Sequence, residues 1–378
     1  MNDRWRGAAG PLLVAGLLAV VVVAWQVVPV LRSHGSRAVG DGEHPDTYGF
    51  DLQDCLVDRA VLVGGQMPRD GVPVLDAPRL VTAAGVDSLN AIIRGKYLVS
   101  SDRVIGVVVG GAARAYPVRV LCWHEVVNDT LGGVPVAVAY NPLCDSAAAF
   151  AVAGDGDTLR FGISGLLWNS CHLLYDRRPD RADESLWSPL QARAVAGPAA
   201  AVGRVLRGLP LAVLRWDDWR RLQPATTVVL PEPALRERYR RNPYGVYYGD
   251  ERLRFPVAPR SSADEPRLKE PVVAVEAGGQ TRVYVLRDVA RRAGLADGDL
   301  VWPDSPGGVA AALGRRLAAD PAGWTTTQGN ATLRFTVRPE PLTVLVADVD
   351  RPGRPLPVRQ AFWFAWHAQR PGDLPNGR

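Results

Sequence analysis

The sequence predicts a β-rich α+β protein, with an internally duplicated β unit that is sandwich- or barrel-like, short helices and one N-terminal transmembrane helix. Three observations support this fold class. Short runs rich in β-branched residues alternate with glycine and proline, which is typical of strands separated by turns. One stretch recurs at a fixed spacing, which indicates a duplication. A long uncharged segment near the N-terminus has the length of a membrane-spanning helix.

The N-terminal region is predicted to anchor the protein in a membrane. Residues 1–10 form a short tail, and residues 11–31, "PLLVAGLLAVVVVAWQVVPVL", carry no charge. As a helix rising 1.5 Å per residue they would span about 30 Å, the thickness of a bilayer's hydrocarbon core. The run does not end in an A-x-A-like cleavage site, so we expect an uncleaved single-pass anchor. Residues 32–50 are a polar tether, and we expect the body beyond it to be exported and extracytoplasmic.

The body is predicted from short local patterns. Six runs have the composition and length of strands, namely 103–109, 134–140, 158–164, 226–230, 271–277 and 342–349. Glycine pairs at 110–111 and 278–279 predict hairpin turns. Helical patterns are sparser and cover 117–128, 216–222, 286–293 and 308–319. The late aromatic run 362–367, "FWFAWH", is predicted to be a core strand.

An internal repeat is the most informative structural signal. The stretch "VIGVVVGGAARAYPVRVL" from Val104 aligns without a gap on "VVAVEAGGQTRVYVLRDV" from Val272, at an offset of 168. The tetrapeptide "TLRF" at 158–161 recurs at 332–335, at an offset of 174. Two features in the same order predict a duplicated unit. We therefore divide the body, 51–370, into halves of about 51–262 and 263–370, followed by a tail at 371–378.

The charge pattern excludes one class of partner. The 44 basic and 39 acidic residues are interspersed, and the formal net charge is +5. Only two of the basic residues, Lys96 and Lys269, are lysines. A nucleic-acid-binding protein would show a concentrated basic stripe with interleaved aromatics, which this chain lacks. We expect no nucleic-acid partner, and protein partners are not indicated.

Candidate functional residues lie in the first half, in segments that the second copy lacks. They are "CWHEVVND" (122–129), "YNPLCDSA" (140–147) and "NSCH" (169–172). Because the second copy folds without counterparts of "WHE" and "PLC", these residues are not needed for the fold. We expect any site to include His124, Glu125, Cys144, Asn169 and Cys171.

Three kinds of chemistry fit these side chains. In the first, His124, Cys144, Cys171 and His172 bind a copper or zinc ion as a cofactor. In the second, Cys144 is a nucleophile, His124 its base and Glu125 or Asn128 the group that orients the base, as in a cysteine–histidine hydrolase or transferase. In the third, Cys144 forms a structural or redox-active disulfide with Cys171 or Cys122.

Further alternatives stay open beside these. Tyr244 belongs to "YRRNPYGVYYGD" (239–250), whose tyrosines and arginines suit the wall of a site for an anionic or sugar-like ligand, with Asn169 and Cys171 as further cofactor-binding residues. A histidine and tryptophan in an apolar run are also common core residues. On that reading the body is a non-catalytic ligand-binding or scaffold domain. Metal binding or thiol redox chemistry is the leading expectation.

The ordered motifs of the body resemble a known family. They include "GGQMPRDGVPVLDAP" (64–78), "ARAYPVRVLCWHEVVNDTLGGVPVAVAYNPLC" (113–144), "TLRFGISGLLWNSCHLLYDR" (158–177) and "QAFWFAWHA" (360–368). The chain is similar in these to the bacterial and archaeal family catalogued as domain of unknown function 3179, whose activity is not established. The resemblance implies an exported or membrane-anchored protein. The family commonly has Cys-Pro-Leu-Cys where this chain has Asn141-Pro142-Leu143-Cys144, so one of a pair of sulfurs is absent here.

Overall fold

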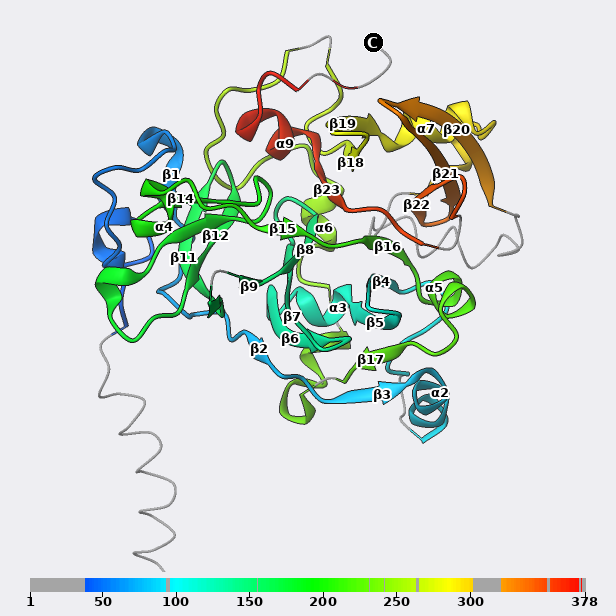
Figure 1. Ribbon diagram of the computed structural model, residues 1–378, viewed down its shortest axis with the longest axis horizontal. Coiled ribbons are helices and arrows are strands. Elements are labelled where there is room, and N and C mark those ends of the chain that lie inside the picture. The colour runs from blue at the N-terminus through cyan, green and yellow to red at the C-terminus, as the bar shows by residue number, and fades with distance from the viewer. Residues whose placement is uncertain are drawn as a thin grey trace, which may run out of the picture. The chain divides into compact units, whose positions relative to one another are not determined.

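Three large β-sheets and a two-stranded sheet form the described part of the chain. The computed structural model describes residues 38–92, 96–154, 156–230, 232–240, 242–262, 265–301, 321–351, 354–373 and 375 (Figure 1). Sheets joined by short helices are the β-rich α+β arrangement that the sequence predicts. The predicted anchor at 11–31 lies outside the described residues. Among those described, no helix combines the length and apolar character needed to cross a membrane.

The two eight-stranded sheets face each other. The central sheet has the order β19 (Gln280–Val285), β18 (Pro271–Ala277), β23 (Val358–Phe362), β8 (Ser146–Ala151), β7 (Val134–Asn141), β6 (Val126–Leu131) and β2 (Leu75–Asp76), with β15 (Arg207–Gly208) paired to β8. The opposing sheet has the order β20 (Ala322–Gln328), β21 (Ala331–Pro339), β22 (Leu342–Asp348), β16 (Leu211–Arg215), β4 (Arg103–Val109), β5 (Ala112–Pro117), β17 (Thr227–Val229) and β3 (Leu80–Thr82).

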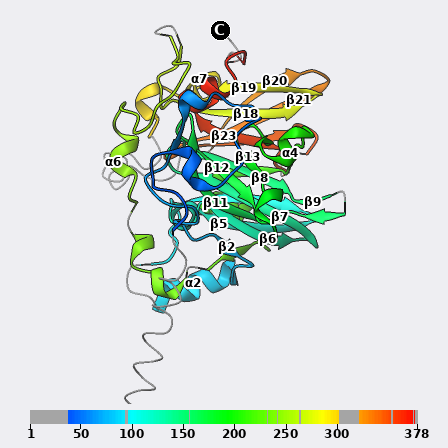
Figure 2. The ribbon, with the colours of Figure 1, turned by 90° about the vertical axis from the view of Figure 1, so that its left-hand side faces the viewer.

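A third sheet covers the other face of the central sheet. It has the order β1 (Leu62–Gly64), β11 (Phe161–Trp168), β12 (Cys171–Asp176), β13 (Leu186–Ser188) and β14 (Arg193–Ala196). The two-stranded sheet is β9 (Ala153–Gly154) with β10 (Asp157–Thr158). In Figure 2 the β9 end lies on the opposite side of the body from helix α6 (Gly245–Tyr248).

The remaining helices are short and lie between strands. They are α2 (Ala83–Ile92), α3 (Val118–Leu121), α4 (Pro198–Ala201), α5 (Trp216–Leu222), α7 (Leu286–Arg292) and α9 (Trp363–Gln369). Single 3-10 turns occur at Pro45–Tyr48, Arg59–Val61, Arg181–Asp183, Pro233–Leu235, Arg238–Arg240 and Asp297–Asp299. The predicted helices at 216–222 and 286–293 are confirmed, whereas the one predicted at 308–319 lies outside the described residues.

Burial on both faces explains the composition of the central strands. In β7, Val136 and Val138 face the opposing sheet, and Ala137 and Ala139 face the five-stranded sheet. The side chains of a strand alternate between its two faces, so a run such as "VPVAVAY" serves two cores at once. Alanines on one face leave room for the larger Phe161, which belongs to the second core. The central sheet is therefore the middle of three layers.

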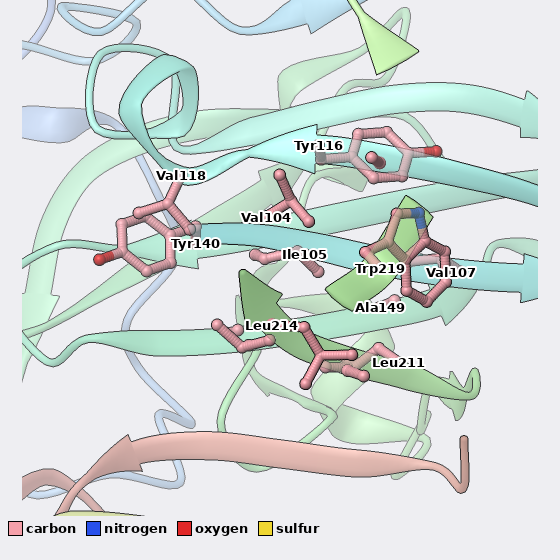
Figure 3. Packing of buried hydrophobic residues seen from close by; sticks show 14 of the residues in the cluster. Val104, Ile105, Val107, Tyr116, Val118, Tyr140, Ala149, Leu211, Leu214 and Trp219 are labelled. Carbon is pink, nitrogen blue, oxygen red and sulfur yellow. The ribbon is translucent and has the colours of Figure 1, made fainter. Parts of the chain in front are cut away.

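The core between the two eight-stranded sheets includes a close approach of helix to strand. Figure 3 shows Trp219 of α5 among side chains of β4, β5 and β16. A Cβ atom at Gly106 of β4 would lie 2.3 Å from the Trp219 ring, so only glycine lets the indole rest on this strand. Trp219 is fully buried, and burial of an aromatic side chain of this size is a major stabilising contribution.

The element order repeats along the chain. The hairpin β4–β5 is followed by α3, and the hairpin β18–β19 is followed by α7. Both hairpins have the same register, since Ile105 pairs with Tyr116 and Val273 pairs with Tyr284. A three-stranded meander then follows in each copy, β6–β7–β8 and β20–β21–β22, and each copy ends in a strand and helix, β16–α5 and β23–α9. The alignment of the stretch from Val104 with the stretch from Val272 therefore continues, as a correspondence of elements, over the whole unit.

The two copies exchange their meanders. The opposing sheet joins the hairpin and last strand of the first copy to the meander of the second, through β16 and β22. The central sheet joins the hairpin and last strand of the second copy to the meander of the first, through β23 and β8. Figure 1 shows β23, in red, entering the sheet beside β8. Because each sheet needs strands from both copies, residues from Gly40 onward form one unit.

The repeated tyrosine has a structural role in both copies. Tyr116 of β5 donates a hydrogen bond of 2.8 Å to Asp129 of β6, and so connects the opposing sheet to the central one. Tyr284 of β19 donates one of 2.9 Å to Gln328 of β20, which connects the same two sheets in the reverse sense. Arg114 also binds Asp129. The bonds of Tyr116 and Tyr284 thus connect each hairpin to the meander of its own copy, which lies in the other sheet.

Three sequence predictions are wrong in detail. The helix predicted at 117–128 ends at Leu121, because "VVNDTL" pairs with β7 as strand β6. The "TLRF" repeat does not join equivalent elements, since 158–161 bridges β10 and β11 whereas 332–335 lies inside β21. The aromatic run predicted as a strand leaves the sheet after Phe362, and α9 begins at Trp363.

Candidate functional site

Three turns bring the predicted residues together. One joins α3 to β6 and carries Glu125, one joins β7 to β8 and carries Cys144, and one joins β11 to β12 and carries Asn169. In the second copy, the turn between β21 and β22 contains only two residues and has no counterpart of "PLCD". The site therefore depends on the longer turn and the inserted sheet of the first half.

The backbone of these turns is unusual. Glu125, Asp145, Asn169 and Ser170 all have positive φ angles, between 43° and 63°. Asparagine and aspartate tolerate this region, whereas glutamate and serine adopt it less often. Such residues cost about 1–3 kcal/mol each and gather where the surroundings fix a particular side-chain arrangement. Four of them at one place indicate a constrained site.

Two free thiols lie in this constrained region. Cys144 is completely buried and Cys171 is 3% exposed. The Cys144 thiol donates a hydrogen bond of 3.2 Å to the carbonyl of Ser170, the residue before Cys171, and both cysteines belong to the same buried cluster. Burial, above all, raises the pKa of the Cys144 thiol well above its usual range, and contact with Cys171 and the charges of Glu125 and Asp145 act in the same direction. Cys144 is therefore a protonated thiol at neutral pH.

A buried carboxylate–imidazole pair includes His172, the residue after Cys171. Glu125 lies 2.7 Å from Nδ1 of His172, and the two residues are 9% and 4% exposed. Nδ1 carries the proton that this bond shares, so Nε2 has the free lone pair when the ring is neutral. Nε2 is buried and has no hydrogen-bond partner among the residues that the structure describes. The pair thus presents an unused proton acceptor inside the protein.

His124 does not join the thiols in the way that the nucleophile hypothesis requires. Its Nδ1 donates to the carbonyl of Pro73 at 2.7 Å, and its Nε2 accepts from the hydroxyl of Tyr239 at 2.5 Å. Burial lowers the pKa of His124, which agrees with a neutral ring held by these two bonds. Both nitrogens are occupied, so the expected hydrogen bond from His124 to Cys144 is not formed.

Asn169 is also committed to structure. Its side-chain amide donates to the carbonyl of Ala368 in α9, and its oxygen accepts from the amide of Ala258. Asn141 has a comparable role, because its side chain accepts from the amide of Leu143 and closes the turn that precedes Cys144. An asparagine suits such a turn without any thiol chemistry. Among the described residues, no group of three or more histidine, cysteine or acidic side chains is arranged to hold a metal ion.

A buried ion pair fixes the turn next to Cys144. Arg103 of β4 makes two hydrogen bonds of 3.0 Å to Asp145, and the two residues are 5% and 3% exposed. Tyr140 donates a further bond of 2.7 Å to Asp145. The ion pair joins the opposing sheet to the central one directly beside the thiol. Sequence reasoning missed it, because its members are 42 residues apart and Arg103 belongs to no functional motif.

The tyrosine-rich segment lies over the same place. Tyr248 contacts Phe362 and lies 3.1 Å, hydroxyl to hydroxyl, from Tyr140. Burial raises the pKa of Tyr244, and the charge of Glu125 adds to this effect. Burial also raises the pKa of Tyr247, and Cys144 and Cys171 act in the same direction. Tyr244 stacks on Tyr248, which packs on the cluster that contains Cys144 and Cys171, so the tyrosine-rich segment singled out in the sequence lies over the thiols.

Comparison with known proteins finds a matching family whose function is not known. A family model described as "Protein of unknown function (DUF3179)" matches residues 69–373, which is more than half of the chain. Neither the curated proteins nor the solved structures give a match. The matched region includes all three turns and the tyrosine-rich segment.

Proposed function

The chain belongs to the DUF3179 family, and we propose that it is a thiol redox protein in which Cys144 and Cys171 interconvert between two thiols and a disulfide. The observation that carries this proposal is that the Cys144 thiol is hydrogen-bonded to the carbonyl of Ser170, the residue before Cys171, and that both cysteines belong to one buried cluster. Cys144 lies in the turn after β7 and Cys171 begins β12, in a region of constrained backbone. A disulfide between them would bring the two sulfurs to about 2.05 Å.

The reaction needs an oxidised sulfur compound as its second reactant. A disulfide of a small thiol or of a partner protein would accept two electrons from Cys144 and Cys171. The sulfur–sulfur bond of that reactant breaks, the bond between Cys144 and Cys171 forms, and two protons leave with the two released thiols. The reverse reaction would return the same electrons to a disulfide substrate.

We assign His172 and Glu125 the handling of one of these protons. Thiol–disulfide exchange requires a thiolate, and Cys144 is held as a thiol by its surroundings. His172 follows Cys171 in the chain, and its Nε2 is an acceptor without a partner among the described residues. Glu125 would stabilise the imidazolium that forms when Nε2 takes a proton.

The other functions have less support. The cysteine nucleophile predicted from the sequence needs His124 as its base, whereas both ring nitrogens of His124 are held by Pro73 and Tyr239. A copper or zinc ion would need more ligands than the described residues bring together. A non-catalytic scaffold is the outcome in which the thiols never react.

The site of disulfide formation tests the proposal. Full-length protein would be incubated with oxidised glutathione, alkylated, and digested without reduction for peptide mapping. We expect one linked pair, Cys144 with Cys171, and no pair after Cys171→Ser. The matched control, Cys55→Ser, leaves the pair intact. Linkage through Cys55 or Cys122, or no linkage in the folded protein, would contradict the proposal.

We further propose that this chemistry takes place outside the cytoplasm, with residues 11–31 as the membrane anchor. The absence of charge in that segment supports the anchor. Disulfides persist in oxidising compartments, which suits the thiol pair. Protease added outside intact cells should digest the body. Protection of the body would place it in the cytoplasm instead.

A further inference from the structure

Lys269, one of only two lysines in the chain, binds the tyrosine-rich segment through its ammonium group. Its ammonium group donates to three backbone carbonyls, those of Tyr247 at 2.5 Å, Arg252 at 2.8 Å and Asp250. It also lies 3.4 Å from the centre of the Tyr247 ring, a cation–π contact. Lys269 is 8% exposed. Three carbonyls and an aromatic face satisfy the buried charge, so the lysine and the segment stabilise each other.

The segment Tyr244–Arg254, called the strap below, has few backbone bonds of its own. Its backbone hydrogen bonds are those of α6 and one from the amide of Asp250 to the carbonyl of Tyr247, and it contains no strand. Its tip is exposed, since Val246 of α6 is 80% exposed. The chain that follows it is fixed to the site, where Ser170 donates to the carbonyl of Phe255 at 3.1 Å. Side-chain contacts, and above all those of Lys269, therefore hold the strap in place.

The inner side of the strap packs on the cluster that contains the thiols. Tyr247 is 4% exposed, yet its hydroxyl has no hydrogen-bond partner among the described residues. A buried hydroxyl without a partner costs about 1–3 kcal/mol, so the closed strap contains one unfavourable element. Tyr248 and Leu253 pack on the cluster that contains Cys144 and Cys171. The strap thus forms part of the cover that keeps Cys144 from solvent.

We propose that the strap is a gate over the thiol pair, that Lys269 holds it closed, and that its opening controls the reaction of Cys144 and Cys171 with any second reactant. The role of this gate in redox chemistry rests on the proposed function. The accessibility of the sulfurs does not, because alkylation measures access whether or not the pair forms a disulfide.

Site-resolved alkylation tests the gate. Full-length protein would be treated with iodoacetamide under native conditions, and the rate at Cys144 and Cys171 followed by mass spectrometry. Lys269→Met keeps the aliphatic stem and removes the ammonium, so we expect both rates to rise at least tenfold. Lys96→Met is the matched control, since it removes the other lysine from an exposed position and should leave the rates unchanged. Equal rates in the wild type and Lys269→Met would overturn the proposal.

The wild-type protein gives a second test that holds even where Lys269→Met folds poorly. The alkylation rate at Cys144 would be measured in increasing urea below the unfolding transition. A local opening exposes little surface, so we expect a urea dependence well below that of global unfolding. A dependence equal to that of global unfolding would show that no separate gate exists. A failed disulfide experiment combined with fast alkylation in Lys269→Met would reject the redox function and retain the gate.

Discussion

Replacement of Arg103 by methionine should destabilise the protein more than any exposed substitution. The change removes two hydrogen bonds of 3.0 Å and leaves Asp145, which is 3% exposed, as a buried charge without its counterion. Removing one partner of a buried ion pair costs about 3–5 kcal/mol. The hydroxyl of Tyr140 at 2.7 Å and the amide of Gln360 at 3.3 Å remain as donors to Asp145. We therefore expect the lower end of that range, about 3 kcal/mol.

A double-mutant cycle measures this interaction directly. Guanidinium denaturation would give the free energy of unfolding of the wild type, Arg103→Met, Asp145→Asn and the double variant. In the double variant neither charge is left uncompensated, so its cost should be about 2 kcal/mol smaller than the sum of the two single costs. A cost below about 1 kcal/mol for Arg103→Met, with costs that add within about 0.5 kcal/mol, would refute the buried pair.

Three other predictions test the fold and the site. Tyr116→Phe should cost about 1.5–3 kcal/mol of unfolding free energy, because its acceptor is a carboxylate, and Tyr284→Phe about 0.5–1.5 kcal/mol, because its acceptor is an amide; equal costs in denaturation would contradict this difference. Unfolded His124 binds a proton more readily than the folded residue, whose pKa burial lowers, so wild-type stability should fall as the pH drops below about 6.5, and His124→Gln should show a shallower fall over the same range. Gly278→Ala should lower the thermal unfolding temperature more than Gly279→Ala. Both glycines have positive φ, but only a Cβ at Gly278 would lie against the backbone, 2.2 Å from an oxygen. A lower unfolding temperature for Gly279→Ala would show that the turn is assigned wrongly.

Local sequence patterns predicted many of the turns and helices of the fold. The glycine pairs at 110–111 and 278–279 both adopt positive φ and both close hairpins of the same register. The helices α5 and α7 begin at the predicted residues, because short amphipathic runs follow buried strands. The exchange of meanders was not predicted, since it depends on the pairing of β16 with β22, whose members are 131 residues apart at Val213 and Val344. Pairing over such distances leaves no local pattern.

The candidate site was predicted in part. Cys144 and Cys171 share one buried cluster, and Glu125 is hydrogen-bonded to His172, the residue after Cys171, while the function of these residues stays a prediction. The partner of Glu125 is 47 residues away, and nothing in either motif distinguishes His172 from His124. A helix through residue 128 was expected, whereas the β-branched residues after Glu125 join a sheet that contains strands from both halves. Tertiary pairing outweighed the local helical pattern.

The most direct test of the central claim is a redox titration of the folded, full-length protein. The protein would be equilibrated in glutathione buffers of graded potential, and the mass of the alkylated product would report the number of free thiols. We expect one two-electron transition, tenfold in its equilibrium constant for every 30 mV or so, that consumes only Cys144 and Cys171. Two results would contradict a functional pair: thiols that stay reduced at every potential while the protein is folded, or thiols that oxidise independently of each other.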